Sequence, residues 1–231
     1  MGIKDISVSA VLAVGISVAG GLIGWGFFKA KESERYVTVK GLAEEPVNAN
    51  QGTWKVSFSS MGKTLTAAIA GNSHDREVVM NFLLKSGFKE SEIRPDTPRV
   101  VDHQDYKSGE VRFSVSDSLV VISDQVELIR EVASKSGSLL QSGIALTGWD
   151  KPQYYYTGLG SIKPVMIEKA TRDARNAAEK FAQDSGSGVG SIRRASQGYF
   201  SFRGESEGIP ETEQVKKIAR VVITVDYSIV K

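Results

Sequence analysis

The first thirty residues contain an unusually long uncharged run. Residues Ile6 to Phe28 are 23 consecutive positions without a charged side chain. At about 1.5 Å rise per residue, a helix of this length measures roughly 35 Å, which is enough to cross a hydrocarbon core of about 30 Å. Lys29 and Lys31 follow the run as a basic stop. The segment therefore predicts a single membrane anchor with a soluble domain attached behind it.

A cleaved secretory signal is the alternative interpretation of the same segment. Lys4 gives a weak basic start, Ile6 to Ile16 gives an apolar core, and Ser17 to Ala19 gives a small-x-small cleavage pattern. The apolar run continues beyond this point to Phe28, which favours an uncleaved signal anchor. N-myristoylation is not expected, because its motif needs Ser or Thr at the position of Ile6. Taken alone, the flanking charges and the positive-inside rule would place the domain in the cytoplasm.

The charge balance argues against a nucleic-acid partner. The whole chain has 29 basic and 27 acidic residues, and 25 basic and 24 acidic ones remain after residue 35. Nucleic-acid surfaces normally show a clustered basic excess, which is missing here. The chain also has no cysteine, which excludes disulfides, thiol catalysis and zinc-thiolate sites.

Hydrophobic periodicity after residue 35 predicts an α+β fold. The expected strands are 36–39, ended by a break at Gly41, and 54–58, 93–101, 111–122, 145–149 and 220–229, and the expected helices are 65–87, 126–133 and 162–184. From 54 to 149 the order is the split βαβ pattern, in which helices cover one face of an antiparallel sheet. The regular strand 220–229 should pair within the sheet. The expected organisation is a tail (1–5), an anchor (6–28), a linker (29–35) and one α+β domain (36–231).

Three strings contain residue types used in catalysis or ligand binding, and each lacks the necessary context. Ser73 to Asp75 holds triad residue types, but neighbours on one helix point about 100° apart and cannot align. Asp102 to Asp105 offers two ligands on one side of a strand, which is an incomplete metal site. Gly186 to Gly190 follows a helix and precedes a strand, which is the reverse of a phosphate-binding loop. We expect no catalytic residues, metal or cofactor from these strings.

Two aromatic segments are candidates for a partner or subunit interface. Tyr154, Tyr155 and Tyr156 are consecutive, and such clusters are common at interfaces because a ring buries area while its hydroxyl stays hydrogen-bonded. Alternate packing of these tyrosines on a sheet is the competing interpretation. The segment 199–214 combines Tyr199, Phe200 and Phe202 with a polar stretch, which predicts a long, mobile hairpin loop.

Several strings together resemble the SIMPL domain family. They are Val39 to Glu44, Ser91 to Thr97, Ala170 to Glu179 and the Val-rich final strand, and the likeness covers nearly everything after Glu34. Tyr154 to Thr157 ahead of Ile162 to Pro164, and Gln197 to Ser201, look like a subgroup of bacterial members with an N-terminal apolar segment.

The resemblance implies a cell-envelope protein, periplasmic and either anchored in the bacterial inner membrane or secreted. Some members are associated with oxidative-stress defence, and some relatives assemble into large rings. We therefore expect a non-catalytic, single-pass envelope protein that forms a homo-oligomer, binds an envelope protein partner, or both. An envelope hydrolase with a site assembled only in three dimensions is the alternative, as is a cytoplasm-facing adaptor if the domain lies inside.

Overall fold

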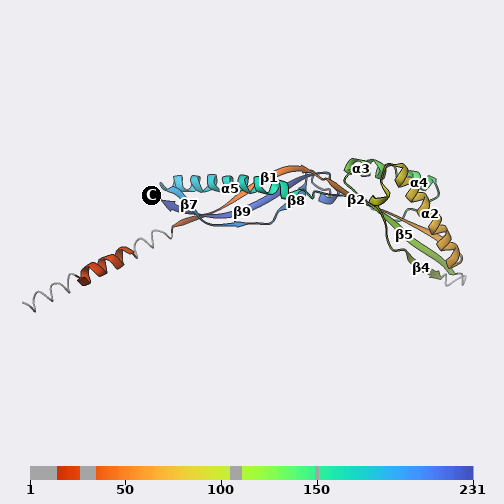
Figure 1. Ribbon diagram of the computed structural model, residues 1–231, viewed down its shortest axis with the longest axis horizontal. Helices are drawn as coiled ribbons and strands as arrows, with labels where there is room; N and C mark the ends of the chain where they lie inside the picture. Colours follow the sequence, from red (N-terminus) through yellow and green to blue (C-terminus); the bar gives the residue numbers. More distant parts are fainter. Residues whose placement is uncertain (1–14, 27–34, 105–110, 149–150, 231) are drawn as a thin grey trace, which may run out of the picture. The chain divides into compact units, whose positions relative to one another are not determined.

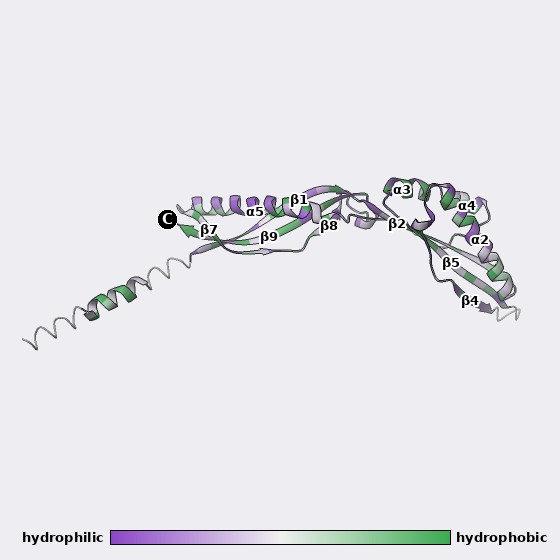
Figure 2. Cartoon of the chain, in the orientation of Figure 1, coloured by the Kyte–Doolittle hydropathy of each residue, from purple (hydrophilic) through white to green (hydrophobic). Residues whose placement is uncertain are grey.

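The predicted anchor is described only in part. The computed structural model describes residues 15–26, 35–104, 111–148 and 151–230, and residues 15–26 form a helix of largely apolar residues (Figure 2). Within these described ranges, no helix is both long and apolar enough to cross a membrane. Residues 6–14 and 27–28 of the predicted anchor lie outside the described residues. Membrane anchoring therefore stays a prediction.

The chain forms two compact units, each with antiparallel strands and helices. The first contains the residues up to Glu44, Pro164–Phe200 and the residues from Arg220 onward, and the second contains Glu45–Lys163 and Ser201–Ala219. Both units combine helices with antiparallel strands, which confirms the α+β class. Three elements contribute residues to both units, namely β1 (Tyr36–Asn48), α5 (Leu159–Asp184) and β9 (Lys216–Val230).

The second unit is built on a five-stranded sheet with the order β3-β5-β2-β6, in which β4 also pairs with β5. Its strands are β2 (Gln51–Gly62), β3 (Ile93–Pro95), β4 (Arg99–Gln104), β5 (Val111–Ser123) and β6 (Gln153–Tyr155). Helices α2 (Leu65–Lys85), α3 (Val126–Ser134) and α4 (Gly137–Gln141) lie on one side of it (Figure 1). Two 3-10 turns, η1 (Glu90–Glu92) and η2 (Glu211–Glu213), complete the unit.

The sequence alternation of β2 explains which face the helices cover. Trp54, Val56 and Phe58 are buried, whereas Lys55 between them is exposed. The first two pair with Val121 and Leu119 of β5, which are buried as well. Side chains of α2, α3 and α4 complete this hydrophobic core. Successive strand residues point to opposite faces, so one regular alternation is enough to define a core-facing surface.

Two predicted strands of this unit differ in the structure. The prediction of a strand at 145–149 is wrong over its described part: Leu146 makes one isolated bridge to Phe58, and Gly148 turns the chain with a φ of +91°. The strand that pairs with β2 at this edge is β6, which begins seven residues after Leu146. The predicted segment 93–101 is divided into β3, which ends at Pro95, and the start of β4 at Arg99. Pro98 lies in the gap and has no N–H to donate to β5.

Strands of the first unit form a sheet with the order β1-β9-β7. β8 (Ser201–Gly204), which belongs to the second unit, also pairs with β9. The predicted terminal strand is confirmed, because β9 lies between β1 and β7 (Gly188–Gln197). Helix α5 lies along this sheet (Figure 1). It begins at Leu159, slightly earlier than predicted, and its buried stripe consists of Met166, Ala170, Ala174, Ala178 and Ala182.

Gly41 does not end the first strand, contrary to the prediction. β1 continues through it to Asn48, and a Cβ at position 41 would lie 2.0 Å from the carbonyl oxygen of Ala170. The backbone N–H of Leu42 donates to Asp173 Oδ2 at 2.9 Å. Gly41 therefore allows β1 to pack closely against α5, and close approach of another backbone is a known reason for glycine inside a strand.

Candidate interaction surfaces

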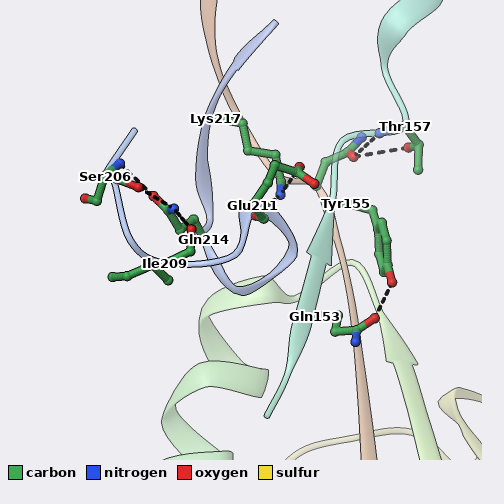
Figure 3. Close-up of polar contacts among 9 residues, drawn as sticks. Gln153, Tyr155, Thr157, Ser206, Ile209, Glu211, Gln214 and Lys217 are labelled. Carbon is green, nitrogen blue, oxygen red and sulfur yellow. Dashed lines mark hydrogen bonds and ion pairs between the residues drawn. The ribbon is translucent and has the colours of Figure 1, made fainter. Parts of the chain in front are cut away.

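The three consecutive tyrosines lie in different environments. Tyr154 is buried in the hydrophobic core of the second unit, and burial raises the pKa of its phenol. Tyr155 is exposed, and its hydroxyl donates to Gln153 Oε1 (Figure 3). Tyr156 is half-buried, and its ring centroid lies 5.9 Å from that of Phe202. This placement follows the alternation of the short strand β6, and an interface role for the exposed rings stays a prediction.

The segment after β6 is fixed to the turn before β2. Both the backbone N–H and the hydroxyl of Thr157 donate to Asn50 Oδ1, at 2.8 and 3.1 Å (Figure 3). The backbone N–H of Asn50 in turn donates to the carbonyl of Tyr155 at 2.9 Å. These bonds hold the chain where it leaves the sheet.

The loop between β8 and β9 carries its own network of hydrogen bonds. The side chain of Gln214 accepts from the N–H of Ser206 at 2.8 Å and donates to the carbonyls of Ser206 and Ile209 (Figure 3). Gly204 leaves room for this side chain, because a Cβ there would lie 2.0 Å from the amide of Gln214. A hairpin loop is thus present at 205–215, whereas residues 201–204 of the predicted loop form β8, and polar residues cross-link the loop internally.

A buried lysine closes the base of this loop. The side chain of Lys217 is 0% exposed and forms an ion pair with Glu211, and its ammonium also donates to the carbonyl of Glu211 at 2.6 Å. Lys151 pairs with Glu213 of the same turn at 2.8 Å. An ammonium without water needs such partners, because burying an unpaired charge is very costly.

Strand β7 is exposed along most of its length. Every residue from Ser191 to Gln197 is exposed, and Tyr199 shortly after the strand is 99% exposed. Phe200 is half-buried. Among the described strands, β7 has β9 as its one pairing neighbour. We call the residues Ser191–Gln197 with Tyr199 the β7 edge.

The backbone of the β7 edge has hydrogen-bonding groups directed away from the sheet. Gly198 donates its N–H to the carbonyl of Val222 in β9 at 2.9 Å. Alternate residues of an antiparallel strand point their polar groups the same way. The N–H groups of Ala195 and Gln197 therefore point to the opposite side of β7, where a further strand would pair.

The triad-like residues on α2 have separate structural roles. The hydroxyl of Ser73 donates to the carbonyl of Ile69 at 3.1 Å, whereas the carboxylate of Asp75 accepts from Ser60. Nearby, Arg76 Nη2 lies 2.6 Å from a carboxylate oxygen of Asp117, whose side chain is fully buried. These bonds connect α2 to the sheet and do not bring a nucleophile to a base.

Asp96 is held ionised far below neutral pH. Its carboxylate accepts from Lys55 at 2.9 Å, from the Thr97 N–H at 2.8 Å and from the Ser118 hydroxyl at 3.2 Å. These hydrogen bonds lower the pKa of Asp96 from 3.8 to about 2. Asp96 and Asp117 line one hollow. A carboxylate with so low a pKa is a weak base at neutral pH, so Asp96 is poorly suited to general acid–base catalysis.

The metal-like and phosphate-loop-like strings form ordinary secondary structure and turns over their described residues. Asp102 and His103 lie on β4 with exposed side chains, while Asp105 of the metal-like string lies outside the described residues. The part of the chain that the structure describes holds no group of three or more potential metal ligands. Gly186 has a φ of +66° and ends α5, and β7 begins at Gly188.

Two features were missed by the sequence interpretation. The first is strand β7, because its small and polar residues show no clear periodicity. Its exposure depends on its place at the edge of a sheet, which is known only after folding. The burial of Lys217 could have been found by extending the alternation of the terminal strand backwards from Arg220, because Lys217, Ala219 and Val221 share one face.

Comparison with known proteins agrees with the motif strings. No curated protein matches the chain. The family model SIMPL, described as a protein of unknown function (DUF541), matches residues 37–225, a range that contains residues of both compact units. The chain therefore belongs to the SIMPL family.

Proposed function

We propose that this SIMPL protein is a membrane-tethered, non-catalytic protein of the cell envelope that works by association, primarily with further copies of itself through the β7 edge. Binding of an envelope protein at the same edge is the second form of the proposal. Asp96 and the other polar groups described above form structural contacts. Any link to stress defence would therefore come from a partner or ligand that the assembly binds.

The observation that carries this proposal is the exposure of the β7 edge. A strand open along one edge offers a row of N–H and C=O groups to another chain. Natural proteins usually shorten, charge or cover such edges. β7 has ten residues and carries two charges, Arg193 and Arg194, and its regular pairing with β9 runs from Arg194 to Gln197, where every residue is exposed. Tyr199 adds an aromatic ring of the kind that is enriched at interfaces.

Location is supported by sequence and family. The uncharged run Ile6–Phe28 is long enough for a membrane anchor, and its described part, residues 15–26, is helical. The SIMPL resemblance favours the extracytoplasmic side of the inner membrane over the cytoplasmic side. An anchor would also raise the local concentration of copies in the plane of the membrane, which promotes weak association.

Photo-crosslinking tests the proposed contact in cells. Tyr199 is replaced by p-benzoylphenylalanine, an aromatic residue that forms a covalent adduct with whatever touches it. Phe181 of α5, which is 62% exposed and lies in the same unit, is the matched control position. We expect an adduct of twice the chain mass from position 199 and much less from position 181.

The remaining outcomes discriminate between the forms of the proposal. An adduct with a different envelope protein at position 199 would contradict self-association and support the second form. Equal adducts at both positions, or none at position 199, would contradict an association surface at the β7 edge.

A further inference from the structure

A hollow of about 600 Å³ lies in the second unit, beside β2 of its sheet. Its walls come from β2, from α3 and α4, and from the connection that leads to β6. Ligand sites for small molecules usually measure about 300–1,000 Å³. We call this hollow the β2–α4 pocket, and it lies apart from the β7 edge in sequence and in unit.

The body of the pocket is apolar. Trp54, Val56 and Leu146 belong to or pack against the hydrophobic core, and Leu140 of α4 is 57% exposed at the pocket. Tyr154 also lines it, and burial raises the pKa of that phenol, so the hydroxyl is neutral at physiological pH. An exposed leucine beside buried apolar walls is the arrangement that a hydrocarbon chain can cover.

The charged residues among the described part of the pocket lining have one sign. Among the described lining residues, Lys55, Arg130 and Lys151 are basic and none is acidic. Each cation does have a carboxylate partner that is not part of the lining: Asp96 at 2.9 Å, Glu127 at 2.5 Å and Glu213 at 2.8 Å, respectively. The side chains of these three cations are 46–70% exposed, so their ion pairs are weak and can be shared with a second anion.

We propose that the β2–α4 pocket binds a single-chain anionic amphiphile, with its hydrocarbon chain against Trp54, Val56 and Leu140 and its anionic head at Arg130 and Lys151. A carboxylate or phosphate head fits this chemistry equally well. Both occur on free fatty acids and on single-chain lipids, and a membrane-tethered domain would meet either at the bilayer surface. The proposal goes beyond association through the β7 edge and does not depend on it.

Calorimetric titration of the full-length protein in discs of zwitterionic lipid tests this site, with empty discs as the blank. The probes are decanoate, decyl phosphate, decanol and inorganic phosphate. We expect saturable binding of decanoate and decyl phosphate at one site per chain. Decanol should bind at least about tenfold more weakly, because it lacks the charge that the basic residues attract. Inorganic phosphate should show no saturation, because it lacks the apolar body.

Two pairs of variants localise the binding. Leu140→Glu places an anion at the pocket, and Met61→Glu makes the same change at a 68% exposed site of the same unit that does not line it. Lys151→Met removes one cation with 70% exposure, and Lys216→Met removes an equally exposed one outside the pocket. Leu140→Glu should weaken decanoate binding about tenfold and Lys151→Met about threefold, while both controls stay at the wild-type affinity.

Three results would overturn the proposal. The first is no saturable binding of decanoate above the empty-disc blank. The second is decanol binding as tightly as decanoate, which would show that the anionic head is irrelevant. The third is an equal loss of affinity in Leu140→Glu and Met61→Glu, which would place binding elsewhere.

Discussion

Individual polar residues stabilise the loop between β8 and β9. The most buried of them is Lys217, and its role depends on which face of β9 it occupies. Lys216 and Lys217 are adjacent and chemically identical, but the side chain of the first is 71% exposed and that of the second is 0% exposed. Strand alternation places them on opposite faces of β9. Lys217 consequently depends on Glu211 for both its ion pair and a hydrogen bond.

Removing the buried ammonium should be far more costly than removing its neighbour. We expect Lys217→Ala to lower the free energy of unfolding by about 2–4 kcal/mol, because it leaves Glu211 without its partner and creates a void. Lys216→Ala should change it by less than about 0.5 kcal/mol. Urea unfolding followed by circular dichroism measures both. Equal effects would show that the Lys217–Glu211 pair does not stabilise the loop.

Residue type alone could not show where each aromatic ring lies. The three consecutive tyrosines allowed either an interface or alternate packing, and a strand of only three residues, β6, gives one buried and one exposed ring. The ring contact between Tyr156 and Phe202 joins positions far apart in sequence, which no local pattern indicates.

At the scale of elements, the packing of α5 on β1 depends on small residues. The buried stripe of α5 is largely alanine, and Gly41 lies directly beneath Ala170 and Ala174. Small side chains on both surfaces allow the helix to approach the strand closely. Dispersion contacts between the two backbones then hold the elements together, without interlocking of large side chains.

A side chain at position 41 should therefore separate the two elements. In Gly41→Ala the new Cβ would meet backbone atoms of α5, and we expect a loss of about 2–4 kcal/mol in the free energy of unfolding. Gly160→Ala, near the start of α5, is the control because a Cβ there meets nothing within 4 Å. That change should be neutral or stabilise by up to about 1 kcal/mol. Thermal unfolding compares the two; equal stability of both variants would contradict the close packing.

Elements with strong local patterns were predicted well, and those defined by long-range packing were not. The stripe of α5 and the alternation of β9 identified both elements, because one face of each is buried throughout. Gly41 predicted a strand break from its local backbone propensity. In the structure, glycine is needed there because helix α5, more than a hundred residues away in sequence, packs against it. The segment 145–149 has strand-like residues but too little length before Gly148 to form more than one bridge.

For the whole molecule, the proposed association depends on which edge of a sheet stays open. The four-stranded sheet ends at β1 on one side and at β7 on the other. On the β1 side, the N–H of Leu42 donates to Asp173, whereas on the β7 side the N–H groups of Ala195 and Gln197 point away from β9. Local periodicity could not predict this asymmetry, because it depends on which strands become neighbours after folding.

The most direct test is the absolute mass of the full-length protein in detergent, measured by light scattering after size-exclusion chromatography. We expect one discrete multiple of the 25.0 kDa chain. Ala195→Pro, which removes an N–H directed away from β9, should shift the mass toward one chain, whereas Ala195→Thr, which keeps that N–H, should leave the multiple unchanged. A wild-type mass of a single chain, or an unchanged multiple in Ala195→Pro, would contradict association through the β7 edge.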